Sequence, residues 1–191
     1  MSHKFEPINS DKLDNPKRRS ILPPEETLQK LNLSPGDIMA DIGCGTGYFC
    51  LPAAQIVGSA GKVYALDISE VMLAKVRERV NKDRLANIEI IKVEEKDFKL
   101  INESITYGLA CFVIHEADST VGFLQEFKRI LKINGKAVII EWEKKASDLG
   151  PPVTDRLAKQ DLMSLMLQVG FSHINLVALT DEFYAVIASK E

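Results

Sequence analysis

The stretch Asp41-Ile42-Gly43-Cys44-Gly45-Thr46-Gly47 has the residue types and spacing of a ligand-binding turn. It begins with a carboxylate and continues with glycines at every second position, which leave no side chains between the backbone and a ligand. The apolar run at 38–40 predicts a short buried strand before it, and residues 48–57 predict the helix after it. In such a turn, free N–H groups and the positive end of the helix face an acidic or electron-rich group. We therefore expect a ligand-binding site here, with a plain tight turn as the alternative.

The spacing of these glycines differs from that of two other nucleotide-binding turns. A dinucleotide-binding turn follows the pattern G-x-G-x-x-G. The sixth position counted from Gly43 is Tyr48, and counted from Gly45 it is Cys50, so the third glycine is missing. A phosphate-binding loop would continue with Lys and then Ser or Thr, which this sequence does not do. The turn is therefore of neither kind.

Asp67 is a second acidic residue at the end of a predicted strand. It closes the apolar run 63–67, twenty residues after Gly47. A carboxylate in this place can accept hydrogen bonds from both hydroxyl groups of a ribose. A surface acid at a strand end is the alternative, but the nearby glycine-rich turn favours a ligand role. Because nicotinamide-dependent enzymes use the same carboxylate, Asp67 by itself does not identify the cofactor.

The elements that must position these acids alternate between strands and helices. We expect strands at 38–40, 63–67, 88–93, 105–113 and 136–142, a turn at 134–135, and a final antiparallel pair at 171–179 and 183–188. We expect helices from Pro23-Pro24 onward and at 48–57, 69–81, 122–131 and 161–169. This alternation predicts an α/β fold with a mostly parallel sheet, helices on both faces, and ligands at the carboxyl ends of the strands.

The composition is that of an ordinary globular domain. The chain has 191 residues, 46% of them apolar and 27% charged, with a net charge of −3, so we expect one domain with its own core. Because the charge predicts no broad basic field, nucleic-acid substrates are disfavoured. No apolar run approaches the roughly 20 residues of a membrane span, and the N-terminus has no apolar signal core.

Three cysteines, Cys44, Cys50 and Cys111, lie in or beside apolar runs. They form no C-x-x-C pair, so we expect neither a metal site nor a disulfide framework. This pattern fits the reducing cytoplasm. Three thiols could in principle bind arsenic, as in arsenite methyltransferases, but burial as small apolar side chains is the favoured role.

From about residue 34 to its end, the sequence resembles the class I S-adenosylmethionine-dependent methyltransferases. The pattern D-x-G-x-G-x-G at 41–47 is similar to motif I of that class, and the closing strand pair is similar to its antiparallel seventh strand. Within the class, the chain is similar to the small stand-alone group related to ubiquinone and menaquinone methyltransferases, the type 11 methyltransferases. The resemblance implies a Rossmann-like, doubly wound seven-stranded sheet of order 3-2-1-4-5-7-6, with strand 7 antiparallel.

The resemblance also implies cofactor roles residue by residue. Asp41 matches the motif I acid, which lies near the methionine end of the cofactor. The loop that passes under the methionine and ribose is matched by Gly43, Gly45 and Gly47. Asp67 matches the ribose acid, and Ile68 matches the apolar residue beside adenine. One mostly structural position departs from the family, because Gly108 stands where an Asp is usual.

The adenine-binding turn and the reacting centre are matched less closely. After the third strand the family has a Gly-Asp-Ala-like turn, in which Glu94 here matches the acid and Glu95 the amide, with Asp97 as the alternative register. The backbone near Cys111 matches the segment that flanks the methionine portion. His115 then points toward the methyl-transfer region, where a neutral imidazole can take a proton near pH 7. A structural histidine that caps the next segment is the alternative.

These matches predict a methyltransferase that uses S-adenosyl-L-methionine, releases S-adenosyl-L-homocysteine and methylates a small molecule. The motifs do not identify that acceptor, although Glu141-Trp142 is a candidate wall of its site. Methyl transfer requires mainly alignment, because the sulfonium is already activated. The alternatives are a non-catalytic cofactor-binding partner subunit of the same fold, and a nicotinamide-dependent oxidoreductase, which the glycine spacing disfavours.

The domain boundary is expected near residue 34. Residues 34–191 form the methyltransferase domain in this interpretation, and residues 1–33 form an N-terminal arm and helix. The first twenty residues are polar and basic in part. A lid over the cofactor and a disordered tail are alternative roles for them.

Overall fold

The structure is a computed structural model that describes residues 14–147 and 150–191 of the chain. The strands of these residues are β1 Ile38–Ile42, β2 Lys62–Asp67, β3 Ile88–Lys92, β4 Ile105–Cys111, β5 Leu131–Trp142, β6 Phe171–Ala178 and β7 Phe183–Lys190. The helices are α1 Pro16–Ile21, α2 Pro24–Lys30, α3 Cys50–Val57, α4 Glu70–Asp83, α5 Thr120–Ile130 and α6 Lys159–Val169, with short 3₁₀-helices η2 Ile114–Glu116 and η3 Val153–Asp155.

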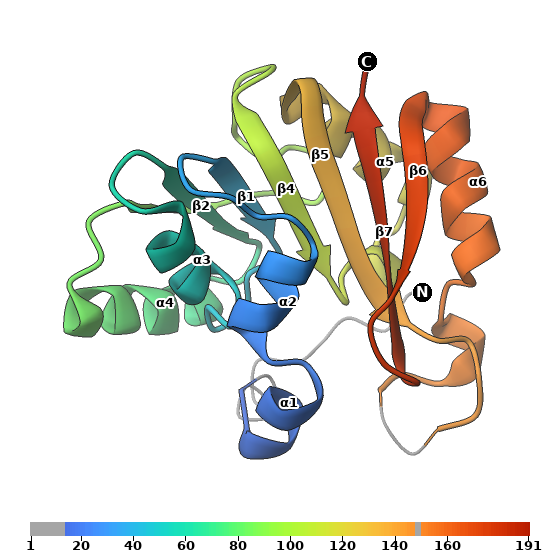
Figure 1. Ribbon diagram of the computed structural model, residues 1–191, viewed down its shortest axis with the longest axis horizontal. Helices are drawn as coiled ribbons and strands as arrows, with labels where there is room; N and C mark the ends of the chain where they lie inside the picture. The colour runs from blue at the N-terminus through green and yellow to red at the C-terminus, as the bar shows by residue number, and fades with distance from the viewer. Residues whose placement is uncertain (1–13, 148–149) are drawn as a thin grey trace.

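The strands form one seven-stranded sheet in the order β3-β2-β1-β4-β5-β7-β6 (Figure 1). Neighbouring strands from β3 to β5 are parallel, whereas β7 runs antiparallel to both β5 and β6. This confirms the Rossmann-like, doubly wound sheet that the resemblance implied. The carboxyl ends of the parallel strands meet at one edge, and the strand order reverses at β1 and β4, which is where such folds bind ligands.

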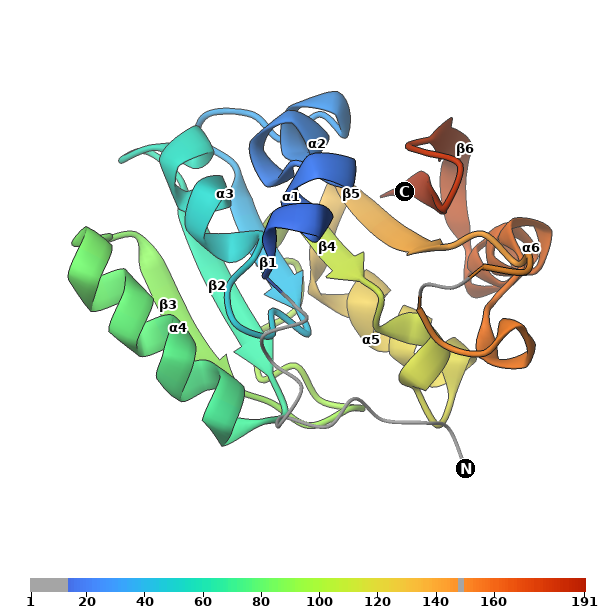
Figure 2. The ribbon, with the colours of Figure 1, turned by 90° about the horizontal axis from the view of Figure 1, so that it is seen from below.

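Helices cover both faces of this sheet. Buried side chains of α2, α3 and α4 pack on one face, and those of α5 and α6 pack on the other. Each helix offers a buried stripe because its apolar residues recur at helical spacing, as Met72, Leu73 and Val76 do in α4. The short helix α1 instead lies beyond the carboxyl ends of the strands, over β1 and β4 in the view from below (Figures 1 and 2).

The turn expected at 134–135 lies within β5 instead of before it. Ile105 and Tyr107 of β4 are separated by one residue, but their partners in β5, Leu131 and Lys136, are separated by four. Asn134 adopts a φ angle of 64° in this irregular segment. The Asn-Gly pair therefore makes a bulge inside the ladder, and the prediction of a later strand start was wrong for this reason.

Gly108 of β4 marks a close contact between the sheet and α5. A side-chain carbon on Gly108 would collide with the ring of Phe127, which is fully buried on α5. A larger residue such as the Asp that is usual in this class would not fit. The departure from the family pattern at Gly108 is thus explained by packing.

We predict that Gly108→Ala lowers the free energy of unfolding by about 1–3 kcal/mol, the usual cost of overpacking a core. Phe127→Leu removes part of the facing ring, so the double variant should lose less than the sum of the two single variants. Thermal unfolding of the wild type and the three variants measures this coupling. An unchanged melting temperature for Gly108→Ala would contradict the contact.

Candidate active site

The glycine-rich loop joins β1 to α3 and needs glycine for its backbone conformation. Gly43, Gly45 and Gly47 have φ angles of 72°, 55° and 92°, a region that disfavours residues with a side chain. A side-chain carbon on Gly43 would also collide with Val113, so the segment after β4 packs directly on the loop. The loop is longer than predicted, because α3 begins at Cys50 rather than at residue 48.

Three amide groups of this loop bind to the protein itself, contrary to the expectation that they would face a ligand. The N–H groups of Gly43 and Cys44 donate to the carbonyl of Leu66 at 2.8 and 2.9 Å. The N–H of Gly45 donates to a carboxylate oxygen of Asp67 at 2.9 Å. The loop is therefore held against the end of β2 before any ligand binds, and the side chains around it carry more of the binding capacity than these amides do.

Asp67 ends β2 and connects two loops at this edge of the sheet. Its carboxylate accepts hydrogen bonds from the N–H of Gly45 at 2.9 Å and from the N–H of Ser69 at 2.8 Å, one on each oxygen. Burial raises the pKa of Asp67, while the hydrogen bonds from the backbone act in the opposite direction. Each carboxylate oxygen can accept a further hydrogen bond, so Asp67 keeps the capacity to bind two hydroxyl groups.

Asp41 carries a buried carboxylate with one unsatisfied oxygen. The residue is 2% exposed, and its Oδ2 has no hydrogen-bond partner among the described residues. Burial raises the pKa of Asp41 to about 7, and the charge of Asp67 adds to this, whereas the N–H of Cys50 and the charge of Arg18 oppose it. Because an unsatisfied buried carboxylate is costly, this oxygen marks a place for a hydrogen-bond donor or a cation.

The N-terminal segment is fastened to the glycine-rich loop by ion pairs. Asp14 accepts hydrogen bonds from Arg19 of α1 at 2.7 and 2.9 Å and from Arg79 of α4 at 2.6 Å. Arg79 also donates to the carbonyl of Thr46, in the loop, at 2.9 Å. Sequence reasoning missed these contacts, since they join residues far apart in the chain. Residues 1–13, which belong to the expected lid, lie outside the described residues.

The residues expected beside adenine lie on the turns after β2 and β3. Ile68 is half exposed, and the side chain of Glu94 is largely exposed. The backbone of Glu94 pairs with that of Asp97 in a tight turn, whereas the carboxylate of Glu95 accepts a hydrogen bond from the N–H of Asp118. The structure thus leaves Ile68 and Glu94 accessible to a ligand and uses Glu95 to join two loops.

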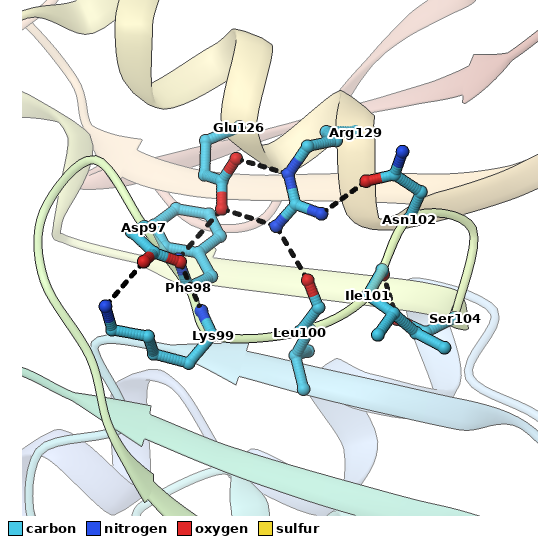
Figure 3. Close-up of polar contacts among 9 residues, drawn as sticks. All are labelled: Asp97, Phe98, Lys99, Leu100, Ile101, Asn102, Ser104, Glu126 and Arg129. Atoms are coloured by element: carbon cyan, nitrogen blue, oxygen red, sulfur yellow. Dashed lines mark hydrogen bonds and ion pairs between the residues drawn. The ribbon is translucent and has the colours of Figure 1, made fainter.

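Two charged residues of α5 hold the chain that follows the turn after β3 (Figure 3). Glu126 accepts hydrogen bonds from the N–H of Phe98 at 2.8 Å and from the guanidinium of Arg129 at 2.6 and 2.7 Å. Arg129 also donates to the carbonyl of Leu100 at 2.7 Å and to the side chain of Asn102 at 2.6 Å. This network anchors the loop between β3 and β4 to α5.

His115, just after the end of β4, and Glu141, near the end of β5, form a buried pair. Nδ1 of His115 lies 3.0 and 2.8 Å from the two carboxylate oxygens of Glu141, which is fully buried. Burial acts to lower the pKa of His115, but the hydrogen bond and charge of Glu141, aided by Glu116 and Asp155, raise the pKa overall. A carboxylate on Nδ1 fixes the ring and its tautomer. The other ring nitrogen, Nε2, lies 3.9 Å from Oε1 of Glu116. The sequence analysis identified Glu141 only as a wall, not as the partner of His115.

Cys111 ends β4 beside the N-terminal segment. Its Sγ lies 4.0 Å from Nη2 of Arg18, and burial raises the pKa of the thiol. The next residue, Phe112, stacks on Trp142 with ring centroids 4.8 Å apart, so aromatic side chains line this part of the edge. Within 14–147 and 150–191, no three His, Cys, Asp or Glu side chains are grouped so that they could hold a metal ion.

The fold and the site together define a class of protein. A doubly wound sheet with an antiparallel β7, a glycine-rich loop after β1, and acidic residues at the ends of β1 and β2 is the architecture of the class I S-adenosylmethionine-dependent methyltransferases. Residues 40–139 match the family described as a methyltransferase domain, the type 11 group, and the chain belongs to this family.

Solved structures of methyltransferases have the same fold. A SAM-dependent methyltransferase from Aquifex aeolicus is 32% identical and superimposes with a TM-score of 0.92, over 97% of this chain and 98% of that one. A putative type 11 methyltransferase from Sulfolobus solfataricus has a TM-score of 0.73 at 24% identity, over 88% and 92% of the two chains. A phosphoethanolamine N-methyltransferase from Haemonchus contortus, solved with S-adenosyl-L-methionine, has a TM-score of 0.72 at 18% identity, over 91% and 52%. These structures share the fold of this chain, and one of them holds S-adenosyl-L-methionine.

Similar curated sequences include demethylmenaquinone methyltransferases. That of Geobacillus sp. strain WCH70 is 29% identical over 124 residues, which are 65% of this chain and 53% of the relative. That of Bacillus mycoides is 30% identical over 117 residues, which are 61% and 49%. The chain spans about half the length of these curated relatives. In the part of the chain that the structure describes, no helix is long and apolar enough to cross a membrane.

We predict that Asp41→Asn stabilises the cofactor-free protein at pH 8 more than at pH 5. With a pKa of about 7, the folded wild type holds a proton that the unfolded chain, with an ordinary pKa of about 3.9, releases between these values. Raising the pH from 5 to 8 therefore lowers the stability of the wild type but not of the variant, by about 3 kcal/mol, because about two pH units of this range lie below the folded pKa. Melting temperatures of both proteins at the two pH values measure this, and an equal difference at both would contradict titration of Asp41.

Proposed function

We propose that this protein transfers the methyl group of S-adenosyl-L-methionine to a small molecule that carries an ionisable hydroxyl group. The buried pair of His115 and Glu141 carries the proposal. This pair lies near the glycine-rich loop, because Val113, two residues before His115, packs against Gly43. An imidazole oriented by a buried carboxylate is suited to remove a proton from an acceptor beside the methyl donor.

The side chains around the glycine-rich loop would hold the donor. The unsatisfied oxygen of Asp41 fits the ammonium group of the methionine portion. Asp67 fits the two ribose hydroxyls, Ile68 offers apolar surface to adenine, and Glu94 offers an acceptor for its amino group. The remaining parts of the donor site in this proposal are Gly43, Gly45, Gly47, Glu95 and the backbone at Cys111. When bound, the donor supplies an activated methyl group, and the protein contributes alignment and exclusion of water.

The proposed role of His115 is that of a general base. With Nδ1 held by Glu141, the neutral ring presents Nε2 as its proton acceptor. The raised pKa of His115 brings the imidazole closer to the acidity of a phenol-like hydroxyl than a free histidine would be. An oriented imidazole favours the enzyme over a non-catalytic partner subunit, because binding a cofactor alone requires no general base.

Aromatic side chains near the ends of β4 and β5 support the proposed chemical class of the acceptor. Phe112 and Trp142 stack on each other near the ends of β4 and β5, and an aromatic cluster at this edge suits an acceptor with an apolar ring. The curated relatives are named for demethylmenaquinone, which is consistent with a ring-bearing acceptor. A cytoplasmic location, expected from the sequence, is part of the same proposal.

We predict that S-adenosyl-L-homocysteine raises the melting temperature and that NAD does not, because a ligand that binds only the folded state stabilises it by mass action.

Asp67→Ala removes two hydrogen bonds to a charged group and should weaken cofactor binding by about 2–4 kcal/mol, or one and a half to three decades. Asp67→Asn should lose less. Glu89→Ala is the matched control, because its carboxylate pairs with Lys62 at the surface, away from the carboxyl end of β3. A shift with NAD alone would overturn the assignment, and equal affinity in all variants would remove Asp67 from the site.

Methyl transfer to a panel of phenols, hydroquinones, thiols and amines, followed with labelled donor, tests the acceptor class. We predict turnover with the hydroxylated rings and a loss of about 10²–10⁴ in the rate of methyl transfer for His115→Asn.

The rate of methyl transfer should rise with pH as His115 becomes neutral. Glu141→Gln removes the charge that raises the pKa of His115, so this rise should move to lower pH. A pH profile that is identical in wild type and Glu141→Gln would exclude His115 as the base.

A further inference from the structure

The helix α6 and the strand β6, which lie side by side at one end of the sheet (Figures 1 and 2), form an uncharged surface. Residues 162–180, which span most of α6 and all of β6, contain no Asp, Glu, Lys or Arg, although 27% of the whole chain is charged. Another uncharged run, at 42–61, is explained by the burial of the glycine-rich loop and α3 in the core. Within 162–180, all of which the structure describes, Leu162, Met166 and Phe171 are buried, and the other side chains are half-buried or exposed. Burial therefore does not explain why this segment lacks charges.

Apolar side chains surround a hollow on this surface. Leu167 of α6 is 66% exposed, and Leu176 of β6 is 44% exposed. Between the two elements lies an open hollow of about 300 Å³, to which Met163, Leu167 and Ile174 contribute apolar walls. Leu176 extends this wall, because residues two apart in a strand share one face. An exposed apolar surface around a hollow is typical of a site for another macromolecule.

The strand β6 is an edge of the sheet, and it lacks the protection of the opposite edge. At that opposite edge, β3 carries Glu89 and Lys92, and Glu89 pairs with Lys62 of β2 at 2.6 Å. Charged side chains on an edge strand hinder its pairing with another chain. Among residues 14–147 and 150–191, no strand lies on the outer side of β6. Its own protection is a bulge near its start, where His173 has a φ angle of 48°.

The middle of β6 offers backbone groups on its outer side. The N–H of Leu179 donates to the carbonyl of Phe183 in β7 at 3.3 Å. In an antiparallel ladder, alternate residues turn both backbone groups to the same side, so Leu176 and Ala178 turn theirs away from β7. The carbonyl of Ala178 accepts a hydrogen bond from Lys30 of α2 at 2.8 Å, which closes that end of the edge. Leu176 is therefore the position available for pairing between the bulge and this end.

We propose that α6 and β6 form a two-fold interface between two copies of this chain, with the two β6 strands antiparallel and Leu176 at the axis. The N–H and C=O of Leu176 then pair with the C=O and N–H of the same residue in the second copy. The axis of an antiparallel pair is perpendicular to the sheet, so α6 of both copies lies on the same face. Leu167 and the hollow of one copy are thereby brought against those of the other.

A second copy fits this surface better than a charged partner does. A residue at a two-fold axis meets its own counterpart, so a charge there would repel itself, whereas an uncharged surface is complementary to itself. Nucleic acids and anionic membranes are bound through basic side chains, and residues 162–180 contain neither Lys nor Arg. Charges lie at the rim instead and are paired within the chain, as His173 is with Glu191 at 3.0 Å. An apolar centre with a polar rim is the usual anatomy of a protein–protein interface.

Pairing through β6 leaves both candidate active sites open. Because β7 is antiparallel to both β5 and β6, β6 runs in the same direction as β1 to β5. Antiparallel β6 strands therefore turn the carboxyl edges of the two sheets in opposite directions. Three strands, β4, β5 and β7, also separate β1 and its loop from β6. The inference thus does not depend on the proposed function, and a monomeric variant should keep its cofactor site.

Sedimentation velocity over a concentration series up to about 100 μM tests the interface. The wild type should be a dimer at the highest concentration. Leu176→Lys and Leu176→Glu should each raise the dissociation constant of the dimer about 100-fold or more, because like charges then meet at the axis. An equimolar mixture of these two variants should recover the dimer, since a cation then meets an anion. Leu167→Glu, on the exposed side of α6, should raise the constant about 10-fold.

Ile101→Lys is the matched control, because Ile101 is 79% exposed on the loop between β3 and β4 and should leave the dimer unchanged. Unchanged far-ultraviolet circular dichroism shows that the variants remain folded, as expected for side chains this exposed. A monomeric wild type overturns the proposal and leaves the surface to a different protein. A dimer of Leu176→Lys as tight as the wild type also overturns it, and so does a mixture of the two Leu176 variants that stays monomeric.

Discussion

The buried carboxylate of Asp41 is the constraint around which this end of the molecule is arranged. Because β1 lies between β2 and β4, a side chain at its end is enclosed by two strands and by the loop that follows. The cost appears in the pKa of about 7, set chiefly by burial. Such a group persists only where a ligand or a function compensates for it. The glycine-rich loop, the placement of α1 and the reacting edge all lie around this one carboxylate.

The donor site is stiffened from both sides by polar networks of the surrounding helices. On one side, Asp14 and Arg79 hold the segment before α1 against the loop. On the other, Glu126 and Arg129 of α5 hold the chain after β3 (Figure 3). Single exposed ion pairs contribute little to stability, but these groups also bind backbone N–H or carbonyl groups of loops. Their main effect is therefore to fix loop positions, which a site that works by alignment requires.

The burial of Glu141, the partner of His115, depends on the antiparallel part of the sheet. Glu141 lies near the end of β5 and pairs with Tyr184 of β7, so β4 and β7 enclose β5 from both sides. This enclosure buries Glu141 completely and makes it an effective partner for His115 across the end of β4. A carboxylate in the same sequence position on an edge strand would be solvated and would influence the imidazole much less.

The fold class followed from local patterns in the sequence, because apolar periodicity and turn residues act over short distances. Asp41, the three glycines and Asp67 were recognisable for the same reason: they end a predicted strand or lie just after one, and parallel strand ends must meet. The sequence left open which charges meet which, since that depends on packing between distant segments. Only the tertiary structure brought Glu141 to His115, Arg18 to Cys111 and Phe127 to Gly108, and only it showed that loop amides are occupied by Leu66 and Asp67. Contacts of this kind are decided by how helices and strands far apart in the chain settle against one another, and no local pattern encodes them.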